Sequence, residues 1–337
     1  MDLRSRIIIA ELGMTHDGSL GQAKAMIAAA ALSGVDAVKL QMHISEAETI
    51  KNAPTPPYFN AEPRYEYFNR TAFDDREWLE LKECAKENKV AFIVSPFSIE
   101  AIDRLYELGI DAFKVPSGEI TNIPYLTRLA ELDVPVILSS GMSTMDEVRK
   151  AVDIFLSMGR ESKTALMQCT SEYPCLPENT GLNLIDEFHS LYPNLPIGFS
   201  DHTSGVWASI AAFTKGAKII EKHFTLSKLM YGPDAKMSME PDEMTLLTKS
   251  LKDLESALSN PVDKSKAEQF TEMRQVFQKS IVAKRSIPAG KTIEKDDLAF
   301  KKPGIGLETK YYKEILGKKV KKALSPDDII YREDILW

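Results

Sequence analysis

Short apolar runs alternate with longer segments in which apolar residues recur at helical spacing, through most of the chain. The runs have the length and β-branched content of buried strands, and the longer segments have the spacing of amphipathic helices. The predicted strands lie at residues 6–12, 36–42, 90–97, 111–115, 134–140, 164–170, 197–202 and 217–223. The predicted helices lie at residues 19–33, 74–88, 98–108, 123–132, 144–158, 182–191, 206–214 and 241–258. Strand–helix alternation predicts a parallel sheet, and eight repeats over about 250 residues predict a (β/α)8 TIM barrel.

A doubly wound open sheet is the alternative fold for this alternation. It is disfavoured because no GxGxxG loop follows the first predicted strand. Residues 44–71 interrupt the pattern and contain PTPPYFN and EPRYEYFNR. Loops of this length in compact domains are more often functional than idle, so we expect an irregular, mobile segment at the rim of the barrel mouth.

The composition changes near Asn260. Residues 261–278 are polar and charged, and short β-rich pieces separated by Pro, Gly and Asp follow them. We therefore predict a catalytic barrel at 1–259, a linker or linking helix at 260–280, and a small β-rich domain at 281–337. No internal repeat is expected beyond the strand–helix alternation.

Charge and cysteine content narrow the class of protein. The formal net charge is −7 and no long basic run occurs, which disfavours nucleic acid or an anionic membrane as partner. Cys84, Cys169 and Cys175 form no CxxC pair. Few unpaired cysteines, no signal-peptide pattern and no run of membrane-helix length favour a reduced, cytoplasmic setting.

Polar side chains gather at the predicted carboxyl ends of the strands, where a parallel β/α protein places its chemistry. His202 and His223 end the last two strands, each beside a carboxylate residue. Two imidazoles at neighbouring strand ends predict a divalent-metal site, whereas one alone would more often be an ordinary buried polar residue. The other strand-end residues are Glu11, Lys39, Gln41, Ser95, Lys114, Ser117, Glu119, Ser139, Ser140, residues 170–173, Ser200 and Glu221.

Lysines and hydroxyls at a barrel mouth suit a phosphate, because lysine supplies charge and serine supplies oriented donors. Lys114 also fits a different chemistry, since a lysine on a barrel strand can form a Schiff base with a carbonyl substrate. The residue types alone leave both readings open. The two histidines with Glu11 favour the metal-and-phosphate reading, because Schiff-base aldolases need no metal.

The ordered set of motifs resembles the sialic acid synthase family, the phosphoenolpyruvate-dependent nonulosonic acid synthases. The motifs are IAELGMTHDGS, VKLQMH, SPFS, FKVPSGE, LSSGM, QCTSEYP, GFSDHT, EKHFT and GPD, and they span nearly the whole barrel. The segment SIPAGKTIEKDDLAFKKPGIGL with LGKKVKKAL is similar to the antifreeze-like, β-clip domain of these synthases. In the family, that domain reaches the barrel mouth of a partner subunit in a domain-swapped homodimer.

The resemblance implies that the chain is a transferase. It would condense phosphoenolpyruvate with N-acetylmannosamine or a related N-acylated, 6-deoxy hexosamine and release phosphate by C–O cleavage, making N-acetylneuraminate or legionaminate. It implies a Mn²⁺ or Mg²⁺ ion on His202 and His223. Phosphoenolpyruvate would contact Lys39, Lys114, Ser117, Ser139, Ser171 and Ser200, and the sugar would contact Gln41, Tyr173 and Lys302. Catalytic carboxylates would be Glu11, Glu119, Glu221 and Asp234.

Three positions depart from the family pattern. Thr15 stands where an Asn often precedes the first His, Ser171 where an Asn contacts phosphoenolpyruvate, and Lys302 where an Arg from the partner grips the sugar N-acyl group. Lysine lacks the planar guanidinium fork of arginine, so these substitutions bear on which sugar is bound more than on which reaction is catalysed. The SGE sequence at 117–119 is closer to the sialic and legionaminic acid synthases than to the pseudaminic ones.

Three alternatives to this reading follow. The first is a pseudaminic acid synthase, the second is a Schiff-base aldolase using Lys114, and the third is a carbohydrate-binding protein on an inactive barrel. The complete set of Lys, Ser and His residues at the strand ends disfavours the third, because a binding scaffold does not need them.

Overall fold

The computed structural model describes residues 1–54, 62–266 and 268–337. The chain divides into two compact units, Met1–Ser259 and Asn260–Trp337. The first unit is a closed barrel of eight parallel strands in sequence order, which confirms the predicted (β/α)8 fold. The strands are β1 (Ile7–Gly13), β2 (Ala37–Met42), β3 (Ala91–Pro96), β4 (Ala112–Val115), β5 (Val136–Ser139), β6 (Thr164–Cys169), β7 (Ile197–Asp201) and β8 (Ile219–His223).

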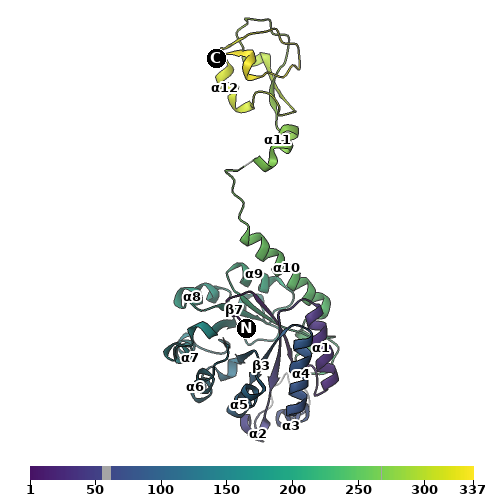
Figure 1. Ribbon diagram of the computed structural model, residues 1–337, viewed down its shortest axis with the longest axis vertical. Helices are drawn as coiled ribbons and strands as arrows, with labels where there is room; N and C mark the ends of the chain where they lie inside the picture. The colour runs from purple at the N-terminus through teal and green to yellow at the C-terminus, as the bar shows by residue number, and fades with distance from the viewer. Residues whose placement is uncertain (55–61, 267) are drawn as a thin grey trace. The chain divides into compact units, whose positions relative to one another are not determined.

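Helices surround this barrel (Figure 1). They are α1 (Leu20–Leu32), α2 (Ser45–Glu48), α3 (Arg64–Thr71), α4 (Asp75–Glu87), α5 (Ile99–Leu108), α6 (Ile123–Glu131), α7 (Met145–Ser157), α8 (Asn183–Leu191), α9 (Trp207–Thr214) and α10 (Pro241–Ser259), with 3-10 helices η1 (Ser117–Glu119), η2 (Glu161–Lys163), η3 (Pro177–Asn179) and η4 (Ala235–Met237). None of the helices in the described part of the chain combines the length and hydropathy that a membrane span requires.

Several helices begin at polar side chains that satisfy their first backbone N–H groups. Ser19 accepts a hydrogen bond from Gln22 N at the start of α1. Asp74 and Thr144 form capping boxes at α4 and α7. Such caps are each worth about 1 kcal/mol, and here they set where each helix starts after its strand.

The interior of the barrel is layered. Side chains alternate along each strand, so every second residue points inward. The lower layers are apolar and include Ile7, Ile9, Ile93, Ile137 and Ile219. One step further along the same strands the inward positions become polar, and this change places the polar set at the carboxyl-terminal mouth.

The segment 44–71 is more regular than the sequence indicated. It contains α2 and α3, and the apolar residues Tyr67 and Phe68 of α3 are buried. The prediction of an irregular segment was therefore wrong for these parts. The stretches with helical spacing are too short there to be recognised from the sequence. They form helices because the folded barrel supplies a surface that buries their apolar residues. Part of the predicted mobile rim segment, residues 55–61, lies outside the described residues.

The second unit is built from short elements around its own core of buried aliphatic residues. They are η5 (Glu268–Phe270), α11 (Thr271–Phe277), β9 (Ser280–Ala283), η6 (Lys295–Asp297), β10 (Leu298–Lys301), η7 (Thr309–Tyr311), α12 (Tyr312–Ile315), β11 (Lys319–Val320), η8 (Arg332–Asp334) and β12 (Ile335–Leu336). Its strands pair antiparallel, β10 with β9 and β11 with β12.

This unit contains a structural repeat that the sequence reading missed. Residues 287–300 and 324–337 each run through a bridge, a turn, a second bridge, a 3-10 helix and a strand. Ile287 and Leu324 exchange two backbone hydrogen bonds of 2.8 and 2.9 Å. Asp297 and Asp334 occupy equivalent positions, each accepting a backbone N–H across 2.9 Å. The repeat is carried by hydrogen-bond positions rather than by side-chain identity, which hides it in the sequence.

Candidate active site

Four buried charged side chains meet at the carboxyl-terminal mouth of the barrel. Glu11 comes from β1, Lys39 from β2, Lys114 from β4 and Glu221 from β8, and each is at most 5% exposed. Lys114 Nζ lies 3.1 and 3.2 Å from the Glu221 carboxylate oxygens. Lys39 Nζ bridges the two carboxylates, 3.1 Å from Glu221 and 3.4 Å from Glu11. The cluster is balanced in charge, with two ammonium groups facing two carboxylates.

The two carboxylates of this cluster differ in proton affinity. Burial raises the pKa of Glu11 to about 7, with Lys39 opposing the shift and Glu221 adding to it. For Glu221, burial alone would raise the pKa, but Lys114 and Lys39 outweigh it and hold the pKa well below its ordinary value. Burial lowers the pKa of Lys114, whereas at Lys39 the two carboxylates overcome burial and raise it. Glu11 is therefore the carboxyl group able to exchange a proton near neutral pH.

Serine hydroxyls gather around a glycine at the same barrel mouth. Ser117 Oγ donates to Ser139 Oγ across 3.1 Å. A Cβ atom on Gly141 would lie only 2.4 Å from Ser117 Oγ and 2.5 Å from Ser171 Oγ. Ser200 Oγ instead donates to Glu221 Oε1 across 3.0 Å. Because Gly141 has no side chain, these hydroxyl groups can lie close together, and grouped hydroxyl donors form a cradle suited to a small anion.

His202 and His223 lie next to each other at the ends of β7 and β8, with ring centroids 5.5 Å apart. His202 Nδ1 lies 2.8 Å from the carbonyl oxygen of Thr170, to which it donates, so the lone pair is on Nε2. His223 Nδ1 is buried and has no hydrogen-bond partner among the described residues. The ring of Tyr173 covers His202 at 4.1 Å between centroids.

The histidine pair fits a divalent ion. Burial is the largest influence on both rings and lowers each pKa to about 3, so both imidazoles are neutral and able to coordinate. The Thr170 carbonyl fixes the tautomer of His202, as backbone carbonyls commonly do for metal-binding imidazoles. In the described part of the chain, no cluster of three or more His, Cys, Asp or Glu side chains is arranged to hold a metal. His202 and His223 are the residues that would hold an ion here.

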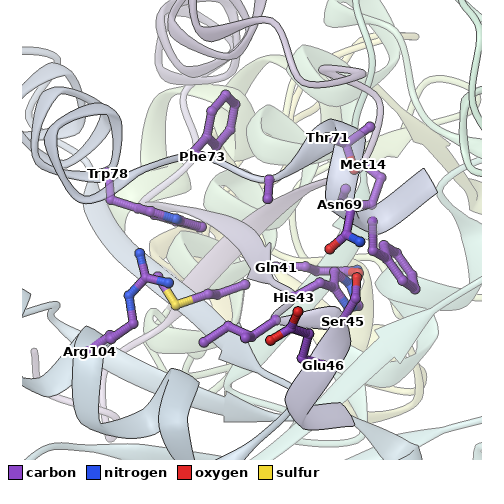
Figure 2. A pocket seen from close by; sticks show the side chains of 14 residues that line it. Met14, Gln41, His43, Ser45, Glu46, Asn69, Thr71, Phe73, Trp78 and Arg104 are labelled. Carbon is purple, nitrogen blue, oxygen red and sulfur yellow. The ribbon is translucent and has the colours of Figure 1, made fainter. Parts of the chain in front are cut away.

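The side of the mouth near β1 and β2 carries the residues expected to meet the sugar. Gln41 Nε2 donates to Glu11 Oε1 across 2.6 Å. Asp234 approaches the same place, because its Oδ2 lies 2.7 Å from where a Cβ on Gly13 would be. Burial raises the pKa of Asp234. Gln41 also lines a cavity of about 180 Å³, together with Met14, His43, Phe68 and others (Figure 2).

Two predicted site residues lie apart from this group. Glu119 is in η1 and accepts a hydrogen bond of 2.7 Å from Asn122 Nδ2. No hydrogen bond or ion pair joins it to the charged cluster within the described residues. Lys302 belongs to the second unit, where it is exposed and its Nζ lies 5.2 Å from the ring centroid of Phe277.

The structure adds residues that strand-end reasoning did not single out. Gly141 shapes the serine cradle, and Cys169 Sγ lies 3.7 Å from Ser117 Oγ at its edge. His43 and Glu48 form a buried pair behind Gln41. The LSSGM and VKLQMH motifs contain Gly141 and His43, so the sequence shows where these two residues lie along the chain. It does not show which side chains they contact.

Comparison with known families identifies both units. The NeuB family model matches residues 26–263, and the SAF domain model matches residues 278–336. The first match covers well over half of the chain and includes the described strand-end residues from Lys39 to Asp234.

Individual relatives cover nearly the whole chain. An N,N'-diacetyllegionaminic acid synthase of Campylobacter jejuni is 37% identical over 335 residues, covering 97% of this chain and 99% of the relative. The N-acetylneuraminate-9-phosphate synthase of Homo sapiens is 34% identical, covering 97% and 91%. Among solved structures, the N-acetylneuraminic acid synthetase of Leptospira borgpetersenii in complex with citrate is 32% identical, has a TM-score of 0.69, and covers 80% of this chain and 91% of that one.

Proposed function

Because the chain belongs to the NeuB family, we propose that it is a nonulosonic acid synthase that condenses phosphoenolpyruvate with an N-acylated amino sugar and releases phosphate. The acceptor we propose is N-acetylmannosamine or its 2,4-diacetamido-6-deoxy analogue, so that the product is N-acetylneuraminate or legionaminate. Relatives named as N,N'-diacetyllegionaminic acid synthases in two organisms support this choice.

The observation that carries the proposal is one barrel mouth holding two lysines, a serine cradle and two neutral imidazoles. Phosphoenolpyruvate has a phosphate and a carboxylate, and both need cationic or hydroxyl donors. Ser117 and Ser171 bring hydroxyl groups to Gly141, Ser139 is hydrogen-bonded to Ser117, and Lys39 and Lys114 supply positive charge at the same barrel mouth. Ser200 Oγ, which donates to Glu221 Oε1 here, would be a further hydroxyl donor to phosphoenolpyruvate.

The proposed reaction forms one carbon–carbon bond and breaks one carbon–oxygen bond. C3 of phosphoenolpyruvate bonds to the aldehyde carbon of the open-chain sugar, whose oxygen gains a proton. Water adds at C2 and loses a proton, and the bond from C2 to the bridging oxygen breaks to release phosphate. Glu11, with a pKa of about 7, is suited to hold the transferred proton.

The other carboxylates take separate parts in the proposal. Asp234, with its raised pKa, faces the sugar side with Gln41 and Tyr173. Glu221 holds Lys39 and Lys114 in place. Glu119, which accepts a hydrogen bond from Asn122, is the alternative to Glu11 as the general base.

We propose that His202 and His223 hold a divalent ion, and Mn²⁺ in preference to Mg²⁺. Imidazole nitrogen is a ligand typical of transition metals, whereas Mg²⁺ takes oxygen ligands almost exclusively. The chemistry that such an ion supplies is polarisation of a carbonyl oxygen. The chain's own contribution is to keep both rings neutral and to fix His202 through the Thr170 carbonyl.

Phosphate release tests the proposal. The enzyme with Mn²⁺, phosphoenolpyruvate and a panel of N-acyl mannosamines and 6-deoxy diacetamido sugars should release phosphate only when an acceptor is present. With ¹⁸O in the bridging position of phosphoenolpyruvate, C–O cleavage places the label in the phosphate. Label retained in the organic product, or no release with any acceptor, would refute the proposed function. Preference for the pseudaminic acid precursor within the panel would instead select the pseudaminic acid synthase alternative.

One observation favours a second chemistry, since burial lowers the pKa of Lys114 and a neutral lysine is what Schiff-base formation requires. Against it, both oxygens of Glu221 lie within 3.2 Å of Lys114 Nζ and favour the ammonium form. Borohydride treatment with pyruvate decides the matter. A covalent adduct at Lys114 would support the aldolase, and its absence in an enzyme that releases phosphate supports the synthase.

We also propose a domain-swapped homodimer in the cytoplasm. Helix α11 of the second unit leaves Met273, Val276 and Phe277 more than half exposed, at the spacing of one helix face. A partner subunit would cover that face and bring its Lys302 to the sugar. Light scattering that finds an active monomer would contradict the dimer. The free thiols of Cys84 and Cys169 favour the reducing compartment.

A further inference from the structure

A buried histidine–carboxylate pair lies directly behind Gln41. His43 follows β2, and its Nε2 is 3.1 Å from Gln41 Oε1. Its Nδ1 is 3.0 and 2.9 Å from the two carboxylate oxygens of Glu48 in α2. The side chains of His43 and Glu48 are 3% and 4% exposed. The proposed reaction assigns neither residue a part, yet His43 lines the same cavity as Gln41 (Figure 2).

Two aromatic rings hold the imidazole of His43 in place. Phe68 stacks on one side at 3.6 Å between centroids and 9° between planes. Phe97 stacks at 4.1 Å and 24°. The ring is therefore confined to one plane, and only its two edges, facing Gln41 and Glu48, remain for hydrogen bonds.

The donors and acceptors along this line admit one consistent assignment when Glu11 is ionised. A carboxylate only accepts, so the amide NH₂ of Gln41 faces Glu11 and its oxygen faces His43. His43 Nε2 must then donate to that oxygen. Glu48 also only accepts, so His43 Nδ1 must donate as well. On this assignment both ring nitrogens carry a proton, so the hydrogen bonds to Gln41 and Glu48 would have to hold His43 as an imidazolium against the burial that lowers its pKa.

The charged and titratable groups around His43 bear on this assignment. Burial is the largest influence and leaves the pKa of His43 below its ordinary value, although Glu48 of α2 opposes the shift through a hydrogen bond and its charge. Arg64 of α3 lowers it, and Asp234 after β8 raises it. His16, after β1, is a neutral neighbour whose own pKa burial lowers to about 4. The two stacked aromatic faces of Phe68 and Phe97 favour a cation between them.

We propose that His43, anchored by Glu48, is a positioning residue that orients the Gln41 amide so that its N–H groups face Glu11 and the sugar cavity. The inference rests on the proposed function, because the cavity is taken as the acceptor-sugar site. One N–H of Gln41 goes to Glu11, which leaves the second for an oxygen of the sugar, either a hydroxyl or an N-acyl carbonyl. With the amide turned over, a carbonyl oxygen would face that position and repel the same sugar atom.

The charge state of His43 is tested without turnover. ¹⁵N-histidine labelling of the full chain, with the His43 signal identified by its loss in His43→Phe, reports how many ring nitrogens are protonated. At a pH above 7, where Glu11 is ionised, we expect both nitrogens of His43 to carry protons. A single proton on Nδ1 would overturn the proposal, because Gln41 would then have to present its NH₂ to His43.

Kinetics of matched variants test the consequence for the sugar. His43→Phe keeps a ring between Phe68 and Phe97 but removes both hydrogen bonds. One hydrogen bond contributes about 0.5–1.5 kcal/mol, so we expect KM for the sugar to rise about 3- to 10-fold. KM for phosphoenolpyruvate should stay unchanged. An equal rise in both KM values, or in neither, would indicate a purely structural part for His43 and overturn the proposal.

Glu48 offers a control that separates charge from orientation. In Glu48→Gln the new amide can donate to His43 Nδ1, so a neutral His43 still donates from Nε2 to Gln41. We expect wild-type KM for the sugar in Glu48→Gln and the raised KM in Glu48→Leu. Equal loss in both variants would overturn the proposal. If the wild-type protein releases no phosphate with any acceptor, the proposed function fails, and the nitrogen signals still decide the orientation of Gln41.

Discussion

Replacing Glu221 by glutamine leaves two buried ammonium groups without their shared counter-charge. Lys39 and Lys114 each lie 3.1 Å from Glu221 Oε1. Glutamine keeps the shape and can still accept from Ser200, so the change removes charge rather than volume. Glu11 still lies 3.4 Å from Lys39, but among the described residues it forms no ion pair with Lys114.

The expected loss of stability follows from the burial of the pair. Removing one partner of a buried ion pair costs about 3–5 kcal/mol, because the other charge stays desolvated and unpaired. A domain of this size loses about 2–4 °C in Tm per kcal/mol, so the barrel transition of Glu221→Gln should fall by roughly 10 °C. The pair of Arg6 with Glu255, 2.7 Å apart, is a control, because Glu255 is 45% exposed and Arg6 keeps Asp36 as a second partner. Glu255→Gln should cost about 1 kcal/mol or less.

Calorimetry of the full chain measures both variants, with and without phosphoenolpyruvate. The ligand brings negative charge to the lysines, so it should raise the Tm of Glu221→Gln by more than that of the wild type. A Tm for Glu221→Gln within about 2 °C of the wild type would refute the reasoning, because the lysines would then not depend on Glu221. An equal ligand effect in both proteins would show that phosphoenolpyruvate does not meet these lysines.

Three further predictions concern the cradle, the metal and the second unit. Gly141→Ala puts a methyl group within 2.5 Å of two serine oxygens and should raise KM for phosphoenolpyruvate about 10-fold, while Gly118→Ala, with nothing within 4 Å, should not. His202→Ala should abolish phosphate release and Mn²⁺ binding by electron paramagnetic resonance with an unchanged circular dichroism spectrum; full activity in chelator would contradict this. Burial alone would raise the pKa of Asp297, but the hydrogen bonds it accepts hold it at about 2. Its contribution is therefore complete above its ordinary pKa of 3.8 and is lost as pH falls toward 2. Asp297→Asn should lower the free energy of unfolding of the second unit by about 2 kcal/mol in denaturant titrations at pH 7 and by less at pH 3, whereas the exposed Asp296→Asn should leave it unchanged.

Much of the barrel could be predicted because its signals are local. Each strand is a short buried run, five of the described barrel helices begin at a side-chain cap such as Ser19, and alternation leaves few ways to connect them. Residues 44–71 were misread because α2 and α3 are too short to show a period, and tertiary burial of Tyr67 and Phe68 stabilises what propensity alone does not.

Closure of the barrel also made part of the site predictable. All eight strands run in parallel, so residues at their carboxyl ends must meet at one rim, whichever strand they come from. That rule alone brings Glu11, Lys39 and Lys114 together with the last two strands. It does not reach Glu119, which turns toward Asn122 in η1 just beyond its strand.

The amino-acid sequence by itself determined the strands, the helices and the set of polar residues at the barrel mouth, because periodicity and strand direction are properties of the chain. Only the tertiary structure decided how those residues are paired. It paired Glu221 with both Lys39 and Lys114 and left Glu11 as the carboxyl group with the raised pKa. It also placed Glu48 against His43 behind Gln41. Pairing depends on distances of a few ångströms between side chains from different strands and helices, and on burial that removes water from around their charges, and neither quantity exists until the barrel is closed.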